Sequence, residues 1–531
     1  MPGLNLVTLA KHIVYHCQTL SVRGDILALT AGTVMPLAFA PYAVPWIAIP
    51  VLCVLFITLL NCSPQRAFIR GWLFGVAQFS ISFYWIYTIF KFSDLSVTGA
   101  LAVASIMMVY LAIFPAIGLW LAVYSAKGKR YLLLLGTLPA GWFFSEWLHT
   151  SISFGFPWMT LGYAQIDTVF SGYAPLIGAL GISYLIALVS ACVIMLFVEK
   201  KSHRFVVPLL VAIVVSGWLF KQITWTKPVG NPIQVSIIQG NILQETKWGE
   251  DIRIPTMQWY REQTLHQLDS DLIIWPETAI ADSLQNATGF IEGLKHGIQN
   301  HNTDIMVGLI DGKIEDRNYR NAILNLKGGI YHKRHLLPFG EYFPWPHAPS
   351  WVQKYLKFPL SDFIPGPAQQ ELIFAAGNQI GSSICFEIAY PSEIRKSLPQ
   401  ANILVNISND GPFRNSTEPY LHHQIARMRA LEFGRYVLRA VNTGFSAIIN
   451  PRGENIAISS LSRSEIIKGK AQPMAGETPY AAFENMPILI LCFVVMVGFN
   501  FAKPVKIKKI LVYIYSKMSQ RELYDVTKQK D

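Results

Sequence analysis

Residues 98–126 read TGALAVASIMMVYLAIFPAIGLWLAVYSA, and this stretch contains no Asp, Glu, Lys or Arg. A helix needs about 20 predominantly apolar residues to cross the hydrocarbon core of a bilayer. The backbone of such a segment must also satisfy its own hydrogen bonds, which a helix does. The stretch therefore predicts a membrane-spanning helix and indicates that the fold contains a membrane domain.

Similar apolar runs occupy most of the first 222 residues, and one more follows near the C-terminus. Together they predict eight spans, at 26–40, 45–61, 71–90, 98–126, 131–149, 170–198, 205–222 and 486–502. The first run has an alternative interpretation as a signal peptide, with Arg23 as its charged region and LAFA at 37–40 as its cleavage site. The hydrophobic spans that follow favour a membrane helix instead.

The positions of the basic residues test the number of spans independently. Lys and Arg occur before the first run and in alternate connections after it: Lys11, Arg23, Arg66, Arg70, Lys127, Lys129, Arg130, Lys200, Lys201 and Arg204. The sequence KPVKIKKI at 503–510 follows the last run. Because cytoplasmic loops are rich in Lys and Arg, both termini are predicted to be cytoplasmic. The predicted domains are a membrane domain at 1–222, an exported domain at 223–485, and a last helix with a basic tail at 486–531.

The basic residues beside the predicted spans also account for much of the net charge of +11. Lysines and arginines beside a membrane are attracted to anionic lipid head groups. No basic run in residues 223–485 has the interleaved aromatic residues of a nucleic-acid surface. The sequence therefore indicates a membrane partner and no nucleic-acid partner.

The exported block changes to short runs of β-branched residues separated by polar, amphipathic stretches. Strands are predicted at 233–238, 271–276, 304–310, 321–326, 378–386, 401–408 and 446–451, with helical segments such as 250–269 and 284–300 between them. Alternating strands and helices predict an α/β sandwich of about 250 residues. The strands are apolar throughout, as expected where helices cover a sheet.

Cys385 is the one cysteine of this block. The other five lie in or beside predicted spans: Cys17, Cys53, Cys62, Cys192 and Cys492. Cysteines in an oxidising compartment are usually paired. A single exported thiol, here within SSICFEIAYP (382–391), is therefore either a buried core residue or a residue kept for its reactivity.

Polar side chains follow three of the predicted strands. Glu277 comes after one strand, Lys333 and Glu341 lie eight residues apart in one loop, and Cys385 is followed by Glu387. Ligand sites of α/β sheets tend to lie beyond the carboxyl ends of strands, so these groups are candidates to converge. Each of the charged groups, taken alone, is also compatible with an ordinary polar loop residue.

Together these side chains suit nucleophilic attack on an acyl carbon. Cys385 attacks only as a thiolate or with a base at hand, and Glu277 can be that base if burial raises its pKa. Lys333 can supply positive charge where the oxyanion develops. No histidine is needed. His422 and His423 are neighbours in a predicted helix and do not face each other, so no metal site is expected there.

At these residues the sequence resembles the nitrilase superfamily, and more narrowly the bacterial apolipoprotein N-acyltransferase family. The resemblance covers nearly the whole chain and includes AFAPY (38–42), GFPWMTLGYAQID (155–167), QGNILQETKW (239–248), IIWPETAI (273–280), HLLPFGEYFP (335–344), ICFEIAYP (384–391) and RMRALEFGRYVLRAVNTG (427–444). It implies a membrane helical bundle of about eight spans with an exported α-β-β-α sandwich domain.

The resemblance also implies an activity. Glu277 would act as general base, Lys333 as electrostatic stabiliser and Cys385 as the nucleophile that accepts the acyl chain. A phospholipid, expected to be phosphatidylethanolamine, would be the donor, and the N-terminal diacylglyceryl-cysteine of an apolipoprotein the acceptor. The family resemblance implies no cofactor, a monomer, and a place in the bacterial inner membrane with the catalytic domain in the periplasm.

Four further residues match family positions around the site. Glu341 and Glu387 would complete it by orienting Lys333 and by hydrogen bonding. Trp248 matches an aromatic residue on a mobile arm at the lipid entrance, and Asn321 matches a position near the pocket.

One loop departs from the family pattern. The chain reads SNDGPFR at 408–414, with Pro412 and Arg414 where relatives have Trp and Gly. Proline fixes φ and removes a hydrogen-bond donor, so this loop is expected to take another course. Phe386 also replaces the commoner tyrosine beside the nucleophile.

Two other functions are compatible with part of the pattern. A membrane-tethered amidase would use the same Glu, Lys and Cys, although a tether needs only one helix. A transporter or receptor would use 223–485 as a binding domain, but transporters usually carry charged or broken segments at mid-membrane, and the predicted spans have nearly none.

Overall fold

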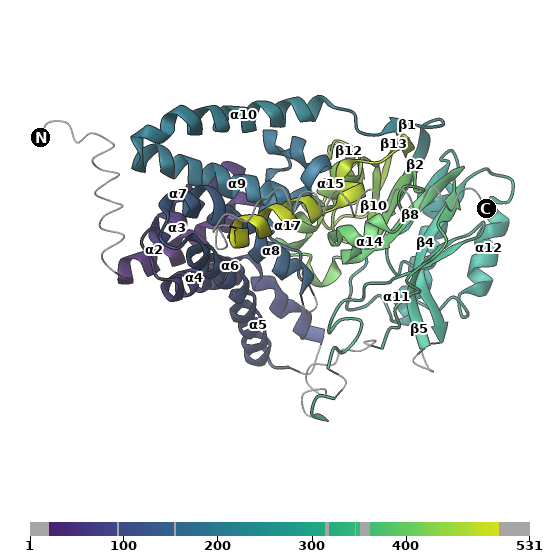
Figure 1. The fold of residues 1–531 in the computed structure, drawn as a ribbon. Coiled ribbons are helices and arrows are strands. Elements are labelled where there is room, and N and C mark those ends of the chain that lie inside the picture. The colour runs from purple at the N-terminus through teal and green to yellow at the C-terminus, as the bar shows by residue number, and fades with distance from the viewer. Residues whose placement is uncertain are drawn as a thin grey trace, which may run out of the picture.

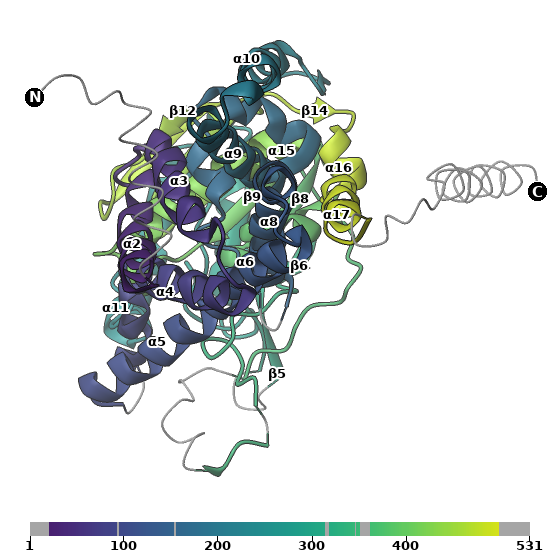
Figure 2. The same cartoon turned by 60° about the vertical axis from the view of Figure 1, so that its left-hand side comes forward.

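The computed structural model describes residues 21–92, 95–152, 155–313, 318–345, 347–350 and 362–498. Lys11, Cys17 and the basic sequence at 503–510 lie outside these residues. Figure 1 shows a helical part, formed by the N-terminal region, beside a sandwich of two β-sheets. The last helices lead from the sandwich back to the helical part (Figure 2).

The helical part is built from helices of very different length. They are α2 (Ser21–Val34), α3 (Ala48–Leu59), α4 (Pro64–Ser82), α5 (Val97–Leu111), α6 (Ile113–Ala126), α7 (Arg130–Leu132), α8 (Leu138–Ser151), α9 (Ala174–Val198) and α10 (His203–Gln222). A Cβ atom added to Gly118 of α6 would lie 2.3 Å from the carbonyl oxygen of Gly141 in α8. Glycine at this crossing therefore lets two helix backbones touch, as is common in membrane bundles.

Several of these helices are long and apolar enough to cross a membrane. Within the described residues there are three such segments, Val97–Ala126, Val169–Val198 and Lys200–Gln222. A fourth is obtained if Pro64–Ser82 and Tyr84–Phe90, which are bent by 58° from each other, form one broken span. Shorter apolar helices lie at Pro45–Leu59 and Met486–Val497. A membrane domain agrees with the sequence, whereas the number of eight spans stays a prediction.

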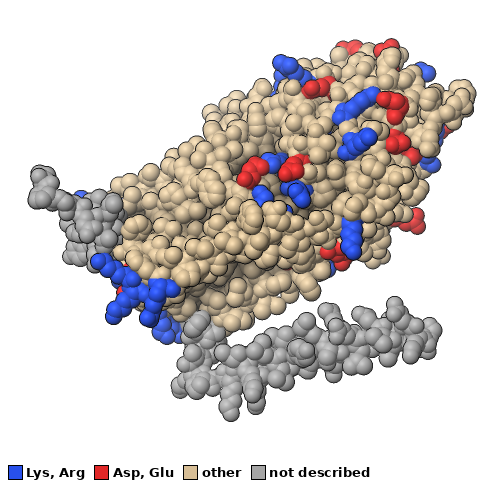
Figure 3. Space-filling model, turned by 90° about the horizontal axis from the view of Figure 1, so that it is seen from above, with Lys and Arg blue, Asp and Glu red and all other residues tan. Residues whose placement is uncertain are grey.

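Two of the basic connections lie together at one end of the helical part. The ring of Tyr131, after the loop at 127–130, packs against the ring of Phe205, after the loop at 200–204, with centroids 6.5 Å apart. On the face drawn in Figure 3, Lys and Arg gather at one end of the molecule, an uncharged area follows, and mixed charges are spread from about the middle of the face to the other end. This distribution suits a helical part surrounded by lipid, with charged surfaces on both sides.

The first sheet of the sandwich has the strand order β13-β2-β3-β4-β5-β6. These strands are β2 (Ile233–Gln239), β3 (Leu272–Ile274), β4 (Asp304–Lys313), β5 (Asn318–Asn325), β6 (Ile330–His332) and β13 (Glu465–Ala471). The pairs β2–β3 and β3–β4 are parallel, and the remaining pairs are antiparallel. The helices α11 (Glu250–Leu265) and α12 (Thr288–Ile298) follow β2 and β3 and connect the parallel strands.

The second sheet has the order β12-β11-β10-β9-β8-β7. Its strands are β7 (Ile373–Ala375), β8 (Asn378–Ile384), β9 (Ile403–Ser408), β10 (Val437–Val441), β11 (Ala447–Ile449) and β12 (Asn455–Ile458). The connecting helices are α14 (Pro391–Arg395) and α15 (Glu418–Phe433). A short ribbon of β1 (Lys227–Pro228) and β14 (Met474–Ala475) and the helices α16 (Pro479–Phe483) and α17 (Met486–Phe493) complete the chain.

The two sheets pack face to face through an apolar core. Ile237 and Met306 of the first sheet belong to one buried cluster with Val405 and Leu438 of the second. A separate cluster fixes α11 and α12 on the outside of the first sheet, and another fixes α14 and α15 on the second. The predicted α-β-β-α sandwich is therefore confirmed, and all seven predicted strands overlap observed ones.

Helix α15 joins the sandwich to the helical part. Its Leu421 and Met428 pack into the core of the helical part, while its Phe433 packs on the other side beneath the second sheet. Helix α9 breaks at Gly178, which has φ 65° and lies where an added Cβ atom would meet the Tyr480 ring at 2.2 Å.

The break in α9 exposes a backbone donor that α15 satisfies. The backbone N–H of Ala179 donates to Glu432 Oε1 at 2.7 Å, and Glu432 Oε2 lies 2.8 Å from Arg429 Nη1. An unpaired backbone N–H would be costly inside the membrane part. A buried ion pair of α15 therefore fixes the position of the sandwich on the helical part.

Candidate active site

Glu277 follows β3 at a sharp turn of the chain. The strand end is fixed by Trp275, which is fully buried, stacks on Tyr260 at 4.9 Å, and donates from Nε1 to Thr264 Oγ1 at 3.0 Å. Thr278 has φ 46°, a left-handed conformation that side chains other than glycine rarely adopt. The turn leaves the Glu277 side chain facing the interior, with Glu277 9% exposed.

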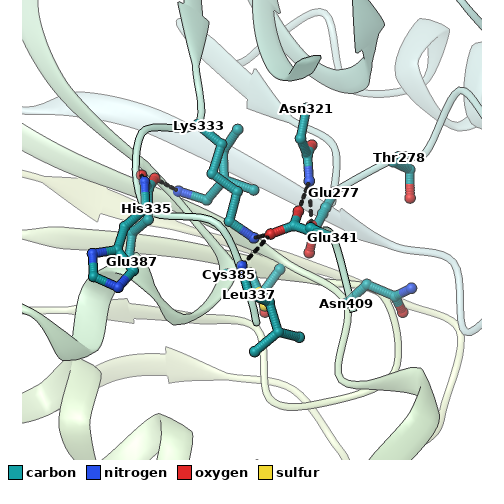
Figure 4. Close-up of polar contacts among 12 residues, drawn as sticks. Glu277, Thr278, Asn321, Lys333, His335, Leu337, Glu341, Cys385, Glu387 and Asn409 are labelled. Carbon is teal, nitrogen blue, oxygen red and sulfur yellow. Dashed lines mark hydrogen bonds and ion pairs between the residues drawn. The ribbon is translucent and has the colours of Figure 1, made fainter. Parts of the chain in front are cut away.

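Lys333, directly after β6, meets Glu277 in the interior. Its Nζ atom lies 2.8 Å from Glu341 Oε2 and 4.0 Å from Glu277 Oε1, and Lys333 is 1% exposed (Figure 4). Asn321, on β5, donates from Nδ2 to Glu277 Oε1 at 2.6 Å and to Glu341 Oε1 at 3.0 Å. The structure thus brings together four of the residues selected from the sequence.

The surroundings of this cluster act differently on the pKa of Glu277 and on that of Lys333. Burial raises the pKa of Glu277, against the opposing effect of the Lys333 charge and the Asn321 hydrogen bond. Burial alone would lower the pKa of Lys333, but the negative charges of Glu341 and Glu277 raise it above its usual value. Lys333 therefore stays an ammonium, whereas Glu277 is a stronger base than a solvated carboxylate.

Cys385 stands at the end of β8, where the backbone leaves the strand. It has φ 55° and opens a 3₁₀ turn at Cys385–Ala389, so the strand ends at Ile384, two residues before the predicted end. Asn406 of β9 donates from Nδ2 to the Cys385 carbonyl oxygen at 3.1 Å. Strained backbone of this kind persists only where the surroundings fix it, and it clusters at functional sites.

The Cys385 thiol lies beside the end of the Lys333 side chain (Figure 4). Burial raises the pKa of the thiol and the Glu277 charge raises it further, while Lys333 opposes both. The cysteine is therefore a thiol at rest and needs a base to become a nucleophile. Phe386 contributes its ring, whose centroid lies 5.3 Å from Lys333 Nζ, in a cation–π contact.

Glu387 ties the cysteine strand to the lysine loop. Its carboxylate is fully buried and accepts hydrogen bonds from Ile384 N (2.7 Å), Arg334 N (2.7 Å), His335 N (2.9 Å) and Tyr331 Oη (3.0 Å). One side chain thus sets the position of the residues that flank both Cys385 and Lys333. Glu341 contacts Lys333 directly, so the two glutamates act on the lysine by different routes.

A second buried polar network lies behind Cys385, and sequence reasoning missed it. Arg439 of β10 donates to Asn406 Oδ1, and its Nη2 lies 3.3 Å from Asp410 Oδ2. His422 Nδ1 lies 3.1 Å from Asp410 Oδ1 and 3.3 Å from Glu418 Oε1. The oxygen and nitrogen atoms of Asp410, Glu418 and His422 lie within 4.8 Å of one another, and Arg439 already supplies positive charge there. His423 takes no part in this group.

Trp248 lies in the turn between β2 and α11, half-buried, with its ring centroid 5.6 Å from Lys247 Nζ. Its neighbour Lys247 reaches the site instead. Lys247 is 4% exposed, donates from Nζ to Thr278 Oγ1, and lines a cavity together with Glu277. The sequence QGNILQETKW contained this lysine, but a lysine in a loop gives no signal of burial.

The loop that departs from the family pattern docks on the helical part. The residues Gly411–Phe413 form a 3₁₀ turn after β9. Thr88 donates from Oγ1 to the carbonyl oxygen of Pro412 at 3.1 Å, and Phe413 packs edge-on against Trp85 at 4.9 Å. Pro412 thus contributes its backbone acceptor, which a proline retains.

Two family models match the chain, one over each half. The model described as the apolipoprotein N-acyltransferase N-terminal domain matches residues 31–192, and the carbon-nitrogen hydrolase model matches residues 234–480. Among solved structures, a mutant of the amidase from Nesterenkonia sp. aligns at 11% identity and a TM-score of 0.36, covering 49% of this chain and 97% of that one. The match to the carbon-nitrogen hydrolase model indicates that the sandwich has the nitrilase-like fold.

Similarity to curated proteins extends over both halves. The apolipoprotein N-acyltransferase of Methylococcus capsulatus is 38% identical over 91% of this chain and 96% of its own length. That of Coxiella burnetii is 35% identical over 89% of this chain and 99% of its own length. The chain belongs to the apolipoprotein N-acyltransferase family.

The role of Glu387 as a structural tie leads to a stability prediction. Glu387→Ala removes the acceptor of the buried Ile384 N–H and Tyr331 hydroxyl and of two partly buried N–H groups, and each unsatisfied buried group costs about 1–3 kcal/mol. We expect a fall in the thermal unfolding temperature of the detergent-purified protein that corresponds to at least about 3 kcal/mol. Glu292→Ala, which removes an exposed carboxylate paired with Lys295, serves as the control and costs less than about 1 kcal/mol. Equal shifts in the two variants would contradict this role.

Proposed function

We propose that this chain transfers an acyl chain from a phospholipid to the α-amino group of the N-terminal diacylglyceryl-cysteine of apolipoproteins, through a thioester on Cys385. The observation that carries the proposal is the convergence of Glu277 and Lys333, 4.0 Å apart, beside Cys385, in a member of this family. The reaction would complete the maturation of a lipoprotein. Phosphatidylethanolamine is the donor we expect, and a single chain contains every residue invoked.

In the first half-reaction the sulfur of Cys385 attacks the ester carbon of the donor. Glu277 takes the thiol proton as the C–S bond forms, and the ammonium of Lys333 stabilises the oxyanion. The ester C–O bond then breaks, and the proton on Glu277 passes to the departing oxygen. The products are the thioester and a lysophospholipid.

In the second half-reaction the acceptor amine attacks the thioester carbon. The C–N bond forms and the C–S bond breaks, and Glu277 passes a proton from nitrogen to the departing sulfur. The covalent intermediate divides one difficult transfer into two steps and leads to ping-pong kinetics. The acyl chain ends as an amide, and Cys385 is again a thiol.

The neighbouring residues would orient these three. Glu341 holds the Lys333 ammonium at 2.8 Å, and Asn321 donates to the Glu277 carboxylate, which favours its charged form. Glu387 fixes the backbone on both sides of the cluster. Trp248 would act at the entrance, where the lipid chains arrive.

Both substrates carry long chains that would stay in the bilayer, since each buried CH₂ contributes about 0.8 kcal/mol. We propose that the domains are 1–222, 223–485 and 486–531, and that eight spans hold the site at the outer leaflet of the bacterial inner membrane. Both termini would then be cytoplasmic and the sandwich periplasmic. The three long apolar helices and the adjoining basic loops at 127–130 and 200–204 support this arrangement.

An acyl adduct on Cys385 is the direct test of the mechanism. Purified protein mixed with phosphatidylethanolamine should gain the mass of one acyl chain, and a diacylglyceryl-cysteine peptide should remove it while becoming acylated. Cys385→Ala should gain no mass. A wild-type protein that never gains mass would contradict the proposed mechanism. Hydrolysis of small soluble amides without lipid would contradict the acyltransferase and favour an amidase.

The rate of adduct formation should depend on the carboxylate form of Glu277. Because burial raises the pKa of this group, the rate should fall on acidification at a higher pH than for a solvated carboxylate. Asn321→Ala removes a hydrogen bond to the charged form, so the fall should move to still higher pH. Stopped-flow or quenched mass measurements between acidic and neutral pH give both curves. A shift of the variant curve toward lower pH would contradict the role of Glu277 as base.

The proposed orientation can be tested by labelling. Asp269→Cys, at an exposed position of the sandwich, should react with a membrane-impermeant maleimide in intact spheroplasts. Lys129→Cys, in an exposed basic connection, should react only after the membrane is broken. The unaltered protein gives the background of its own cysteines. The reverse pattern would place the sandwich in the cytoplasm.

A further inference from the structure

Lys247 is a buried lysine whose position the proposed mechanism does not use. It is 4% exposed and donates from Nζ to the hydroxyl of Thr278, the residue after Glu277. Within the described part of the chain, no carboxylate lies within 4.0 Å of its Nζ atom. It therefore differs from Lys333, whose ammonium is paired with Glu341 at 2.8 Å.

Lys247 and the proposed base Glu277 line the same small cavity. Its lining also includes Thr278 and, from α11, Arg253 and Tyr260. Arg253 is only half-buried and is paired with Asp282 and Glu250, so it is neutralised at the rim of the cavity. Arg253 and Thr256, which also line the cavity, are partly exposed, whereas Lys247 and Glu277 are buried.

The second half-reaction has a proton that the catalytic residues leave unassigned. An α-amino group has a pKa of about 7.7–8.0, so the acceptor arrives largely as an ammonium. An ester and a thiol give a thioester and an alcohol without net proton release. A thioester and an ammonium give an amide, a thiol and one free proton. Glu277 returns one nitrogen proton to the sulfur, and Lys333 keeps its charge, so the other proton needs a different acceptor.

We propose that neutral Lys247 accepts this second proton from the acceptor ammonium and releases it through the cavity to water. The inference rests on the proposed function and adds a proton acceptor specific to its second half. The lone pair of the neutral amine takes the proton, and the ammonium that results returns it to solvent at the Arg253 side. The Thr278 hydroxyl, which both accepts and donates, holds the amine in place and can relay the proton.

The environment of Lys247 suits an exchangeable proton. Burial lowers the pKa of Lys247 to about 8, against the opposing charge of Glu277. This pKa matches the pKa of the α-ammonium from which the proton comes, and matched pKa values favour proton transfer. The charged and titratable groups around the amine are Glu277, Arg253 and Tyr260, with the Trp248 ring beside it. Glu277 therefore lies between two lysines, one of which keeps its proton while the other can exchange it.

The test compares two nucleophiles on one preformed acyl-enzyme. At pH values below the pKa of its amine, the diacylglyceryl-cysteine peptide arrives as an ammonium and must lose the extra proton. Hydroxylamine reacts as a neutral amine and gives the hydroxamate and the thiol without releasing one. Lys247→Arg replaces the exchangeable amine by a guanidinium, which stays charged at all these pH values and cannot accept a proton.

We expect Lys247→Arg to raise the ratio of the hydroxylamine rate to the peptide rate on the order of a hundredfold, the size of effect that a general base provides. Thr278→Val, which removes the hydrogen bond to the amine, should raise the ratio in the same direction by a smaller factor. Lys295→Arg, a half-exposed lysine on α12, is the matched control and should leave the ratio unchanged.

The outcomes separate this inference from the proposed function. If Lys247→Arg and Thr278→Val slow both nucleophiles by the same factor, Lys247 has only a structural role and the inference is wrong. If either variant forms the adduct and discriminates against the ammonium, the inference holds even where the other does not fold. A wild-type protein that forms no adduct would instead overturn the proposed function itself.

Discussion

The ammonium of Lys333 is buried at a position where an unpaired charge would be unstable, and much of the sandwich is arranged around it. Taking an ammonium out of water is costly unless opposite charges and hydrogen bonds surround it. Glu341 supplies the closest charge at 2.8 Å, and Asn321 bridges Glu341 to Glu277. Asn321 comes from β5, Lys333 and Glu341 from the loop after β6 and Glu277 from the turn after β3, so this part of the first sheet must fold before the charge is stable.

The contacts that hold Lys333 in place also link the two sheets. Glu387 on the cysteine strand accepts the backbone donors that follow Lys333, so the lysine loop cannot shift without disturbing the end of β8. On its other side, the cysteine carbonyl is held by Asn406, which Arg439 holds in turn. The left-handed conformation of Cys385 is therefore fixed from both directions. A thiol held this rigidly can attack a carbon with little loss of conformational freedom.

Much of this arrangement was predictable, and the exceptions have physical reasons. The apolar strands and the residues after them selected Glu277, Lys333 and Cys385, which lie close together in the structure, because strand ends and carboxyl edges are regular features of α/β sheets. Trp248 was predicted at the entrance, and the structure describes only its position beside Lys247. The strand β10 was missed because it is short and carries Arg439 among apolar residues. Such a charge inside an apolar strand is itself a signal of a buried polar network, since a buried charge needs a partner.

Burial has opposite consequences for the two lysines near Glu277, although it disfavours the charged form of both. Lys333 has a carboxylate at 2.8 Å, and this attraction outweighs the cost of desolvation, so its pKa rises. Lys247 has a hydroxyl instead, which interacts with either form, so desolvation prevails and its pKa falls to about 8. The partner at hydrogen-bond distance thus determines whether a buried lysine is a fixed charge or an exchangeable proton. The proposed acyl transfer to an ammonium would use both kinds, because it would stabilise an oxyanion with a charge that persists and dispose of a proton that does not.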